Sequence, residues 1–130
     1  MLKIMVIVAV VILALHGLIH LMGTAAYLKL ATIQELPYKT TLLGGQWEVG
    51  EGGMALYGML WAVAALGFII ASLAFWFGWG WWQPMLIGVS LFSLVLTALD
   101  WQVAFAGVFV NLLILAMIGL RSPLSRWLAS

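Results

Sequence analysis

Long apolar runs separated by short polar stretches fill this chain. Uncharged runs of about 20 residues, the length that a helix needs to cross a hydrocarbon core of about 30 Å, fit into it four times. The pattern predicts an all-α integral membrane protein that forms a single four-helix transmembrane bundle. The helices are expected at about residues 4–28, 54–77, 84–99 and 102–120, with a loop at about 37–53.

The segment after Tyr27 is amphipathic. Lys29, Thr32 and Glu35 alternate with leucine and isoleucine up to Pro37, whose missing N–H is expected to end a helix. The pattern predicts that the first helix continues beyond the membrane surface. A signal peptide is the alternative reading of the N-terminus, but the apolar run is too long for the apolar part of such a peptide.

Composition supports the membrane assignment, because 66% of the residues are hydrophobic and 7% charged, with a mean hydropathy of +1.21. Cysteine is absent, which excludes disulfides and thiolate metal sites. The chain has no basic run, so nucleic acid is not an expected partner. In a four-span topology the cationic residues divide three against two and favour cytoplasmic termini in a prokaryotic inner membrane: Lys3, Arg121 and Arg126 against Lys29 and Lys39.

His16 and His20 are the only histidines, and their spacing of four places them on one face of the first helix. An imidazole in hydrocarbon is costly without a partner, so this face should meet protein or a ligand. Three readings are open: structural histidines, ligands of a tetrapyrrole or metal ion with Asp100 as a third ligand, or a site that handles protons or substrate. Two histidines on one face cannot be opposite axial ligands of one haem, and no glutamate follows the first histidine as in hydrolytic zinc motifs.

The third predicted helix carries a single polar stripe that should point inward, formed by Ser90, Ser93, Thr97 and Asp100. Asn111 is the one strongly polar interior residue of the fourth helix. Hydrogen bonding within or between helices is one explanation for these groups, and a polar pathway is the other. The rise of about 1.5 Å per residue predicts that Asn111 and His20 lie at similar depth, with His16 one turn deeper, so that the polar groups could converge.

Two aromatic or glycine-rich stretches flank the membrane segments. The tryptophans at the predicted tight turn indicate an interfacial belt, with a stacking platform for a pigment or quinone as the alternative: Trp76, Trp79, Trp81 and Trp82. The loop at 44–53 lacks the Lys-Ser/Thr end of a phosphate loop, and its Trp47 is expected to be an interfacial anchor.

Small residues of the second helix predict a packing face: Gly58, Ala62, Ala65, Gly67 and Ala71.

Short motifs occur along nearly the whole chain. They are His-Gly-x-x-His at His16 to His20 with Gly23, then Glu35-Leu36-Pro37, then Gly58 with Trp61 and Ala64 to Leu66, and finally Trp101 with Ala104, Gly107 and Asn111. Together they resemble a family of short prokaryotic four-helix membrane domains of unassigned function. The resemblance implies the fold and no reaction. Its acidic residue after the tryptophan and its following lysine are not matched here, because Asp100 precedes Trp101 and position 105 is Phe105.

The expected function is that of an accessory, structural transmembrane subunit with no enzyme activity of its own. It would pack against other integral membrane subunits of a larger complex, respiratory or photosynthetic, within the lipid bilayer. A membrane protein that binds a tetrapyrrole, metal or quinone at His16 and His20 is the first alternative. A small transporter that uses Asp100 is the second, although the first helix has no carboxylate of the kind that small drug exporters use.

Overall fold

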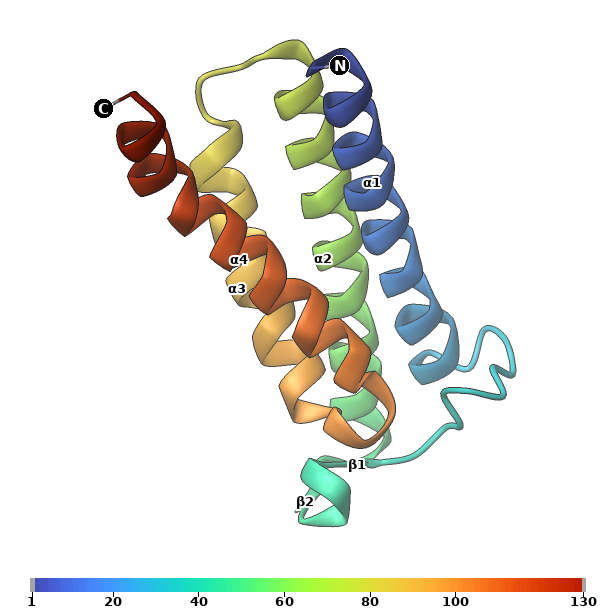
Figure 1. The fold of residues 1–130 in the computed structure, drawn as a ribbon. Coiled ribbons are helices and arrows are strands. Elements are labelled where there is room, and N and C mark those ends of the chain that lie inside the picture. The colour runs from blue at the N-terminus through green and yellow to red at the C-terminus, as the bar shows by residue number, and fades with distance from the viewer. Residues whose placement is uncertain (1, 130) are drawn as a thin grey trace.

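The computed structural model describes the backbone of residues 2–129 and the side chains of residues 3–121. Four helices follow one another along the chain (Figure 1): α1 (Leu2–Tyr27), α2 (Gly50–Phe77), α3 (Trp82–Leu99) and α4 (Trp101–Ala129). Each contains a segment long and apolar enough to cross a membrane: Lys3–Tyr27, Gly50–Phe77, Trp82–Leu99 and Trp101–Arg121. The predicted all-α, four-helix transmembrane class is confirmed.

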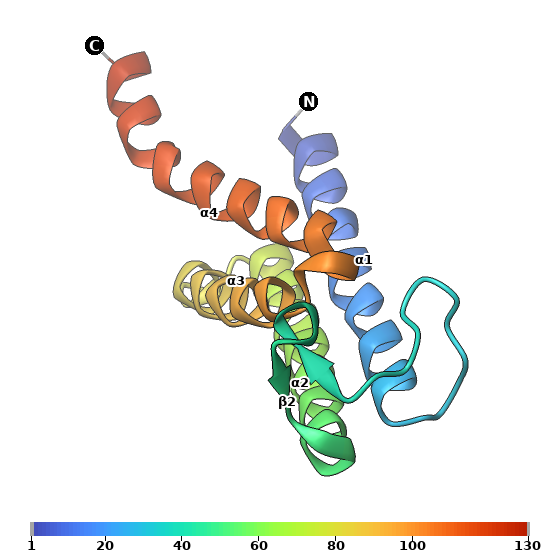
Figure 2. The ribbon, with the colours of Figure 1, turned by 90° about the horizontal axis from the view of Figure 1, so that it is seen from below.

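The helices pack mainly in chain order, α1 on α2, α2 on α3 and α3 on α4. Viewed from the side and from below, α1 and α4 diverge toward the end of the molecule that carries both termini (Figures 1 and 2). Burial follows this arrangement. In the most apolar window of α2, 44% of the residues are buried, against 22% in α1 and 17% in α4.

Helix α1 ends at Tyr27, so the prediction that it continues past the membrane surface toward Pro37 is wrong. Lys29 adopts a left-handed φ of 58°. Its N–H donates to the carbonyl of Ala26 at 3.3 Å, and Leu30 N–H donates to the carbonyl of Ala25 at 2.8 Å. This pair of bonds is a Schellman motif, which satisfies the last carbonyls and turns the chain away from the helix axis.

The other helix boundaries also differ from those expected. Helix α2 begins at Gly50 rather than Met54, and the backbone of α4 stays helical to Ala129 rather than ending near Leu120. The tight turn between α2 and α3 is present as expected, with Gly78 in the left-handed conformation at φ 70° closing α2. Ala104 departs from helical geometry and bends the first turn of α4.

The segment between α1 and α2 folds over the loop side of the bundle. It contains an antiparallel pair, β1 (Thr41–Leu42) with β2 (Trp47–Glu48), joined by a short 3-10 turn, η1 (Leu43–Gly45). Leu36 and Leu42 are buried in the same core cluster as Tyr27. The predicted loop is therefore longer than 37–53, and it is packed against the helices.

An exposed ion pair holds the start of this loop near the start of α2. Lys29 Nζ lies 3.0 Å from a carboxylate oxygen of Glu51, and both side chains are largely exposed. The hydrogen bond to Glu51 raises the pKa of Lys29. Exposed pairs of this kind contribute little to stability, so the buried leucines matter more for the position of the loop.

Glycines allow the helices to approach closely. A Cβ built on Gly17 would lie 2.8 Å from Phe68 Cβ, and one on Gly23 would lie 2.5 Å from the Trp61 ring. On the other side of α2, a Cβ on Gly67 would lie 2.6 Å from Val89. Glycines of α1 thus allow its close approach to α2, and a glycine of α2 allows the close approach of α3.

Candidate functional site

A closed set of hydrogen bonds joins α1, α3 and α4 inside the membrane-spanning part of the bundle. We call its four side chains, His16, His20, Ser93 and Asn111, the histidine network. His16 Nε2 lies 3.1 Å from Asn111 Oδ1, His20 Nε2 lies 2.6 Å from Ser93 Oγ, and Asn111 Nδ2 lies 2.8 Å from Ser93 Oγ. All four side chains are buried.

The partners fix which ring nitrogen carries each proton. His20 Nδ1 lies 2.7 Å from the carbonyl oxygen of His16, which can only accept, so this nitrogen is the donor. In a neutral His20 the other nitrogen, Nε2, then accepts from the Ser93 hydroxyl. Asn111 Oδ1 likewise accepts from Nε2–H of His16. Every bond of the histidine network then has one donor and one acceptor.

Reversing the amide of Asn111 would break this pattern. Its oxygen would accept from the Ser93 hydroxyl, so His20 Nε2 would have to donate to Ser93 while Nδ1 donates to the His16 carbonyl. A histidine with two donors is an imidazolium. Because a charge within the membrane is costly, the orientation with two neutral histidines is preferred.

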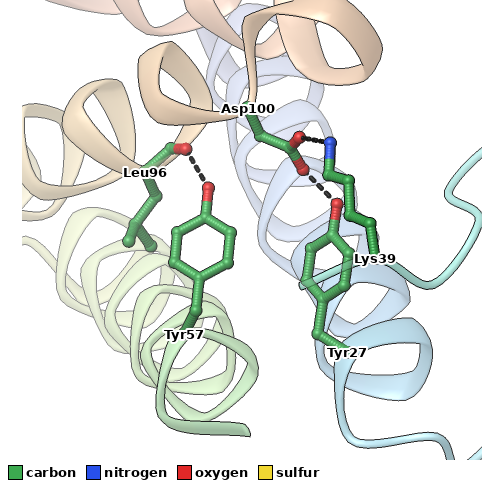
Figure 3. A network of polar contacts seen from close by, with 5 residues as sticks. All are labelled: Tyr27, Lys39, Tyr57, Leu96 and Asp100. Atoms are coloured by element: carbon green, nitrogen blue, oxygen red, sulfur yellow. Dashed lines mark hydrogen bonds and ion pairs between the residues drawn. The ribbon is translucent and has the colours of Figure 1, made fainter. Parts of the chain in front are cut away.

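A second polar cluster lies at the loop side, at the corner between α3 and α4. Asp100 is 2% exposed and accepts hydrogen bonds from the Tyr27 hydroxyl and from the Lys39 ammonium (Figure 3). We call these three residues the loop-side triad. Tyr57 stands beside it and donates to the backbone carbonyl of Leu96. The triad ties the end of α1 and the loop to the α3–α4 corner.

The two other residues of the predicted polar stripe on α3, Thr97 and Ser90, have a local bond or no partner. Thr97 donates back to the carbonyl of Ser93 at 2.9 Å, and its methyl group lies against Gly107 of α4. Ser90 is fully buried, and its hydroxyl has no partner among the residues whose side chains are described. The same holds for the indole N–H of Trp61, which lies next to His20 with ring centroids 5.2 Å apart.

The polar residues that were predicted to converge therefore belong to two separate clusters in the structure. His16 and His20 lie with Ser93 and Asn111, whereas Asp100 belongs to the loop-side triad and is held by Lys39 and Tyr27. Among residues 3–121 no group of three or more His, Cys, Asp or Glu side chains is arranged to hold a metal ion. The proposed third ligand for the histidine pair does not reach it.

The tryptophan-rich turn presents stacked rings at the terminal side of the bundle. Phe77 stacks on Trp79 at 5.3 Å, and Trp79 stacks on Trp81 at 5.4 Å between centroids. Trp76, Trp79 and Trp81 are exposed, whereas Trp82 is partly buried and lies beneath the Arg121 guanidinium. Trp47 is also exposed, on β2. Exposed indoles at both ends of the bundle suit the two membrane interfaces.

Lys39 and Tyr27 are the site residues that the sequence pattern did not single out. The pattern gives Lys39 only as a loop charge, and Tyr27 only as the residue after which the chain becomes amphipathic. Asp100 could have indicated Lys39 from the sequence, because a buried carboxylate requires a cation or hydrogen-bond donors. Lys39 is one of the two cations expected on that side of the membrane. No protein family model, curated protein or solved structure matches this chain.

Proposed function

We propose that this protein is an accessory transmembrane subunit that binds the membrane-spanning part of a larger protein complex. The observation that carries the proposal is the divergence of α1 from α4 (Figure 2). We call residues 4–15 of α1 and 112–120 of α4 the diverging segments. Their outer side chains are apolar and exposed, as illustrated by Met5 at 64% and Met117 at 66%.

The point from which the two helices diverge is held by a specific contact. His16 of α1 and Asn111 of α4 are joined by a hydrogen bond. Leu13 and Ile114, one turn further toward the termini, are still buried in a common core cluster with Phe68. The hydrogen bond and the apolar packing together fix the position of α1 relative to α4 at this level. The divergence beyond it is therefore a property of the fold.

Within residues 3–121, little of the chain outside the membrane-spanning helices is available for binding a partner. The loop between α1 and α2 is tied to the bundle by Lys39 and by the buried Leu36 and Leu42. The turn between α2 and α3 is short. A partner is therefore expected to bind through the membrane-embedded surface.

The partner that fits the diverging segments is an apolar transmembrane helix of another integral membrane protein. Helices associate in membranes by close packing and by a few polar contacts. Neither diverging segment, 4–15 or 112–120, contains a charged residue, so both offer an apolar surface. The proposal places the protein in a prokaryotic inner membrane with cytoplasmic termini. The class of complex, respiratory or photosynthetic, follows from the identity of the partner.

Site-specific photo-crosslinking tests this proposal. A photoreactive amino acid is placed at Ile12 of α1 or at Met117 of α4, both exposed, and the full-length chain is irradiated in its native membrane. Leu66 of α2, which is 61% exposed, provides the matched control on a helix outside the diverging segments.

The expected result is one defined adduct of an integral membrane protein at Ile12 and at Met117, with a weaker or absent adduct at Leu66. Crosslinks to lipid alone at all three positions would overturn the proposal. Equal adducts at all three positions would contradict the assignment of the diverging segments as the binding surface.

A further inference from the structure

We infer that Nδ1 of His16 is a binding point for a membrane-soluble hydroxyl compound of the phenol or quinol class. The inference stands apart from the proposed subunit role, because it concerns a single atom of the histidine network.

The proton assignment leaves His16 with one unused group. Its Nε2–H donates to Asn111, so Nδ1 carries a bare lone pair. Within residues 3–121 the His16 ring forms its hydrogen bond through Nε2 and none through Nδ1. The other nitrogens and oxygens of the histidine network all have partners.

The atom is also not sealed inside the protein. Within residues 3–121 the fully enclosed side-chain nitrogen and oxygen atoms without a partner are Trp61 Nε1 and Ser90 Oγ, and His16 Nδ1 is not one of them. The residue keeps 8% exposure and makes the hydrogen bond that joins α1 to α4. A small molecule dissolved in the lipid can reach this nitrogen. The exposed area of His16 is too small for a whole helix to pack against it.

The chemistry of the lone pair selects the ligand. A bare imidazole nitrogen accepts a hydrogen bond and cannot donate one, so a hydroxyl group binds it and a carbonyl or ether does not. In hydrocarbon such a bond has no competition from water. The His16 ring itself is held in place by edge-on contacts with the buried rings of Phe68 and His20, whose centroids lie 4.8 Å from its own. A phenolic hydroxyl is more acidic than an aliphatic one and therefore donates a stronger hydrogen bond, which favours the phenol or quinol class.

Nitrogen-15 NMR of ring-labelled histidine tests the inference on the full-length protein in lipid nanodiscs. The chain has two histidines, so the spectrum contains four ring nitrogens. Couplings to the ring protons distinguish Nδ1 from Nε2 in each ring. Without ligand we expect Nε2–H with bare Nδ1 in His16, and Nδ1–H with accepting Nε2 in His20.

The probes are para-decylphenol and para-decylanisole, which differ only in the hydroxyl donor. We expect the phenol to move the bare Nδ1 signal of His16 upfield in a saturable manner and the anisole to leave it in place. In His16→Gln, where the amide can still donate to Asn111, phenol binding measured by calorimetry is expected to weaken at least about tenfold. Ser90→Ala lies outside the histidine network and should bind as the native chain does.

Three results would overturn the inference. They are a protonated Nδ1 on His16 in the ligand-free spectrum, equal shifts with phenol and anisole, or no shift of Nδ1 at saturating phenol. All three are read from the native sequence, so the test does not depend on the folding of His16→Gln.

Discussion

Most of the buried polar side chains that the structure describes are hydrogen-bonded within the protein. In the histidine network the amide of Asn111 serves two helices at once, since its oxygen faces His16 and its nitrogen faces Ser93. At the loop side Asp100 is enclosed by Tyr27 and Lys39. At residue scale, these contacts explain why so apolar a chain retains buried histidine, asparagine and aspartate.

Replacement of Asn111 tests the histidine network. Asn111→Ala removes the acceptor for His16 and the donor to Ser93, and it should lower the free energy of unfolding by about 1 to 2 kcal/mol. Unfolding by a denaturing detergent in mixed micelles measures this value. Leu113→Ala, at a 60% exposed position of the same helix, should have a much smaller effect, and equal losses would contradict the role of the amide.

The loop-side triad gives a prediction about charge. Lys39→Met leaves the Asp100 carboxylate without its cation, and we expect a loss of about 2 to 3 kcal/mol, less than for a fully enclosed pair because the Lys39 side chain is 27% exposed. Adding Asp100→Asn should restore part of that loss, since the neutral amide needs no cation. A double variant whose loss equals the sum of the two single losses would contradict an ion pair between these residues.

At the scale of elements, close approach depends on glycines at particular contacts. The helices α1 and α2 meet at Gly17 and Gly23, while α2 and α3 meet at Gly67. By contrast, a Cβ on Gly88 of α3 would have no neighbour within 4 Å. The same residue type therefore has different roles along the bundle.

Alanine substitutions separate these roles. Gly17→Ala places a methyl group 2.8 Å from Phe68 Cβ and 3.2 Å from the carbonyl oxygen of Ala65. It should cost about 1 to 3 kcal/mol of stability through overpacking. Gly88→Ala should be neutral or stabilising by up to about 1 kcal/mol, because alanine favours the helix and meets no clash. Thermal unfolding in detergent compares the two, and an equal response would refute the contact at Gly17.

The sequence predicts the helices well and their ends less well. Apolar runs of membrane length are a strong signal, and the four helices occur where they were expected. The end of α1 was not predictable from the amphipathic pattern, because a Schellman motif with Lys29 in the left-handed conformation ends it, and glycine is the usual signal for that motif. The segment up to Leu36 then returns to the core instead of extending the helix.

The candidate site was predictable only in part, for a geometric reason. Helical spacing places His16 beside His20 and Ser93 near Thr97, but it does not say which helix faces which. The bond between His16 and Asn111 depends on how α1 and α4 are oriented, and that of Lys39 depends on the path of a loop. Contacts between elements distant in the sequence require the fold.

At the scale of the whole molecule, α1 and α4 diverge toward the end that carries the termini, and the loop lies at the opposite end of the four-helix bundle (Figures 1 and 2). The loop covers one end, and the loop-side triad fastens it there. Toward the termini the outer helices diverge and expose apolar side chains over much of their length. This asymmetry underlies the proposal that another membrane protein completes the assembly.

Extraction of the tagged full-length protein from its native membrane in mild detergent tests that central claim most directly. The mass and composition of the purified particle are then measured by native mass spectrometry. The account predicts a particle in which this chain is bound, in a fixed ratio, to a different integral membrane protein. A particle that contains only this chain, as a monomer or as a homo-oligomer, would contradict it.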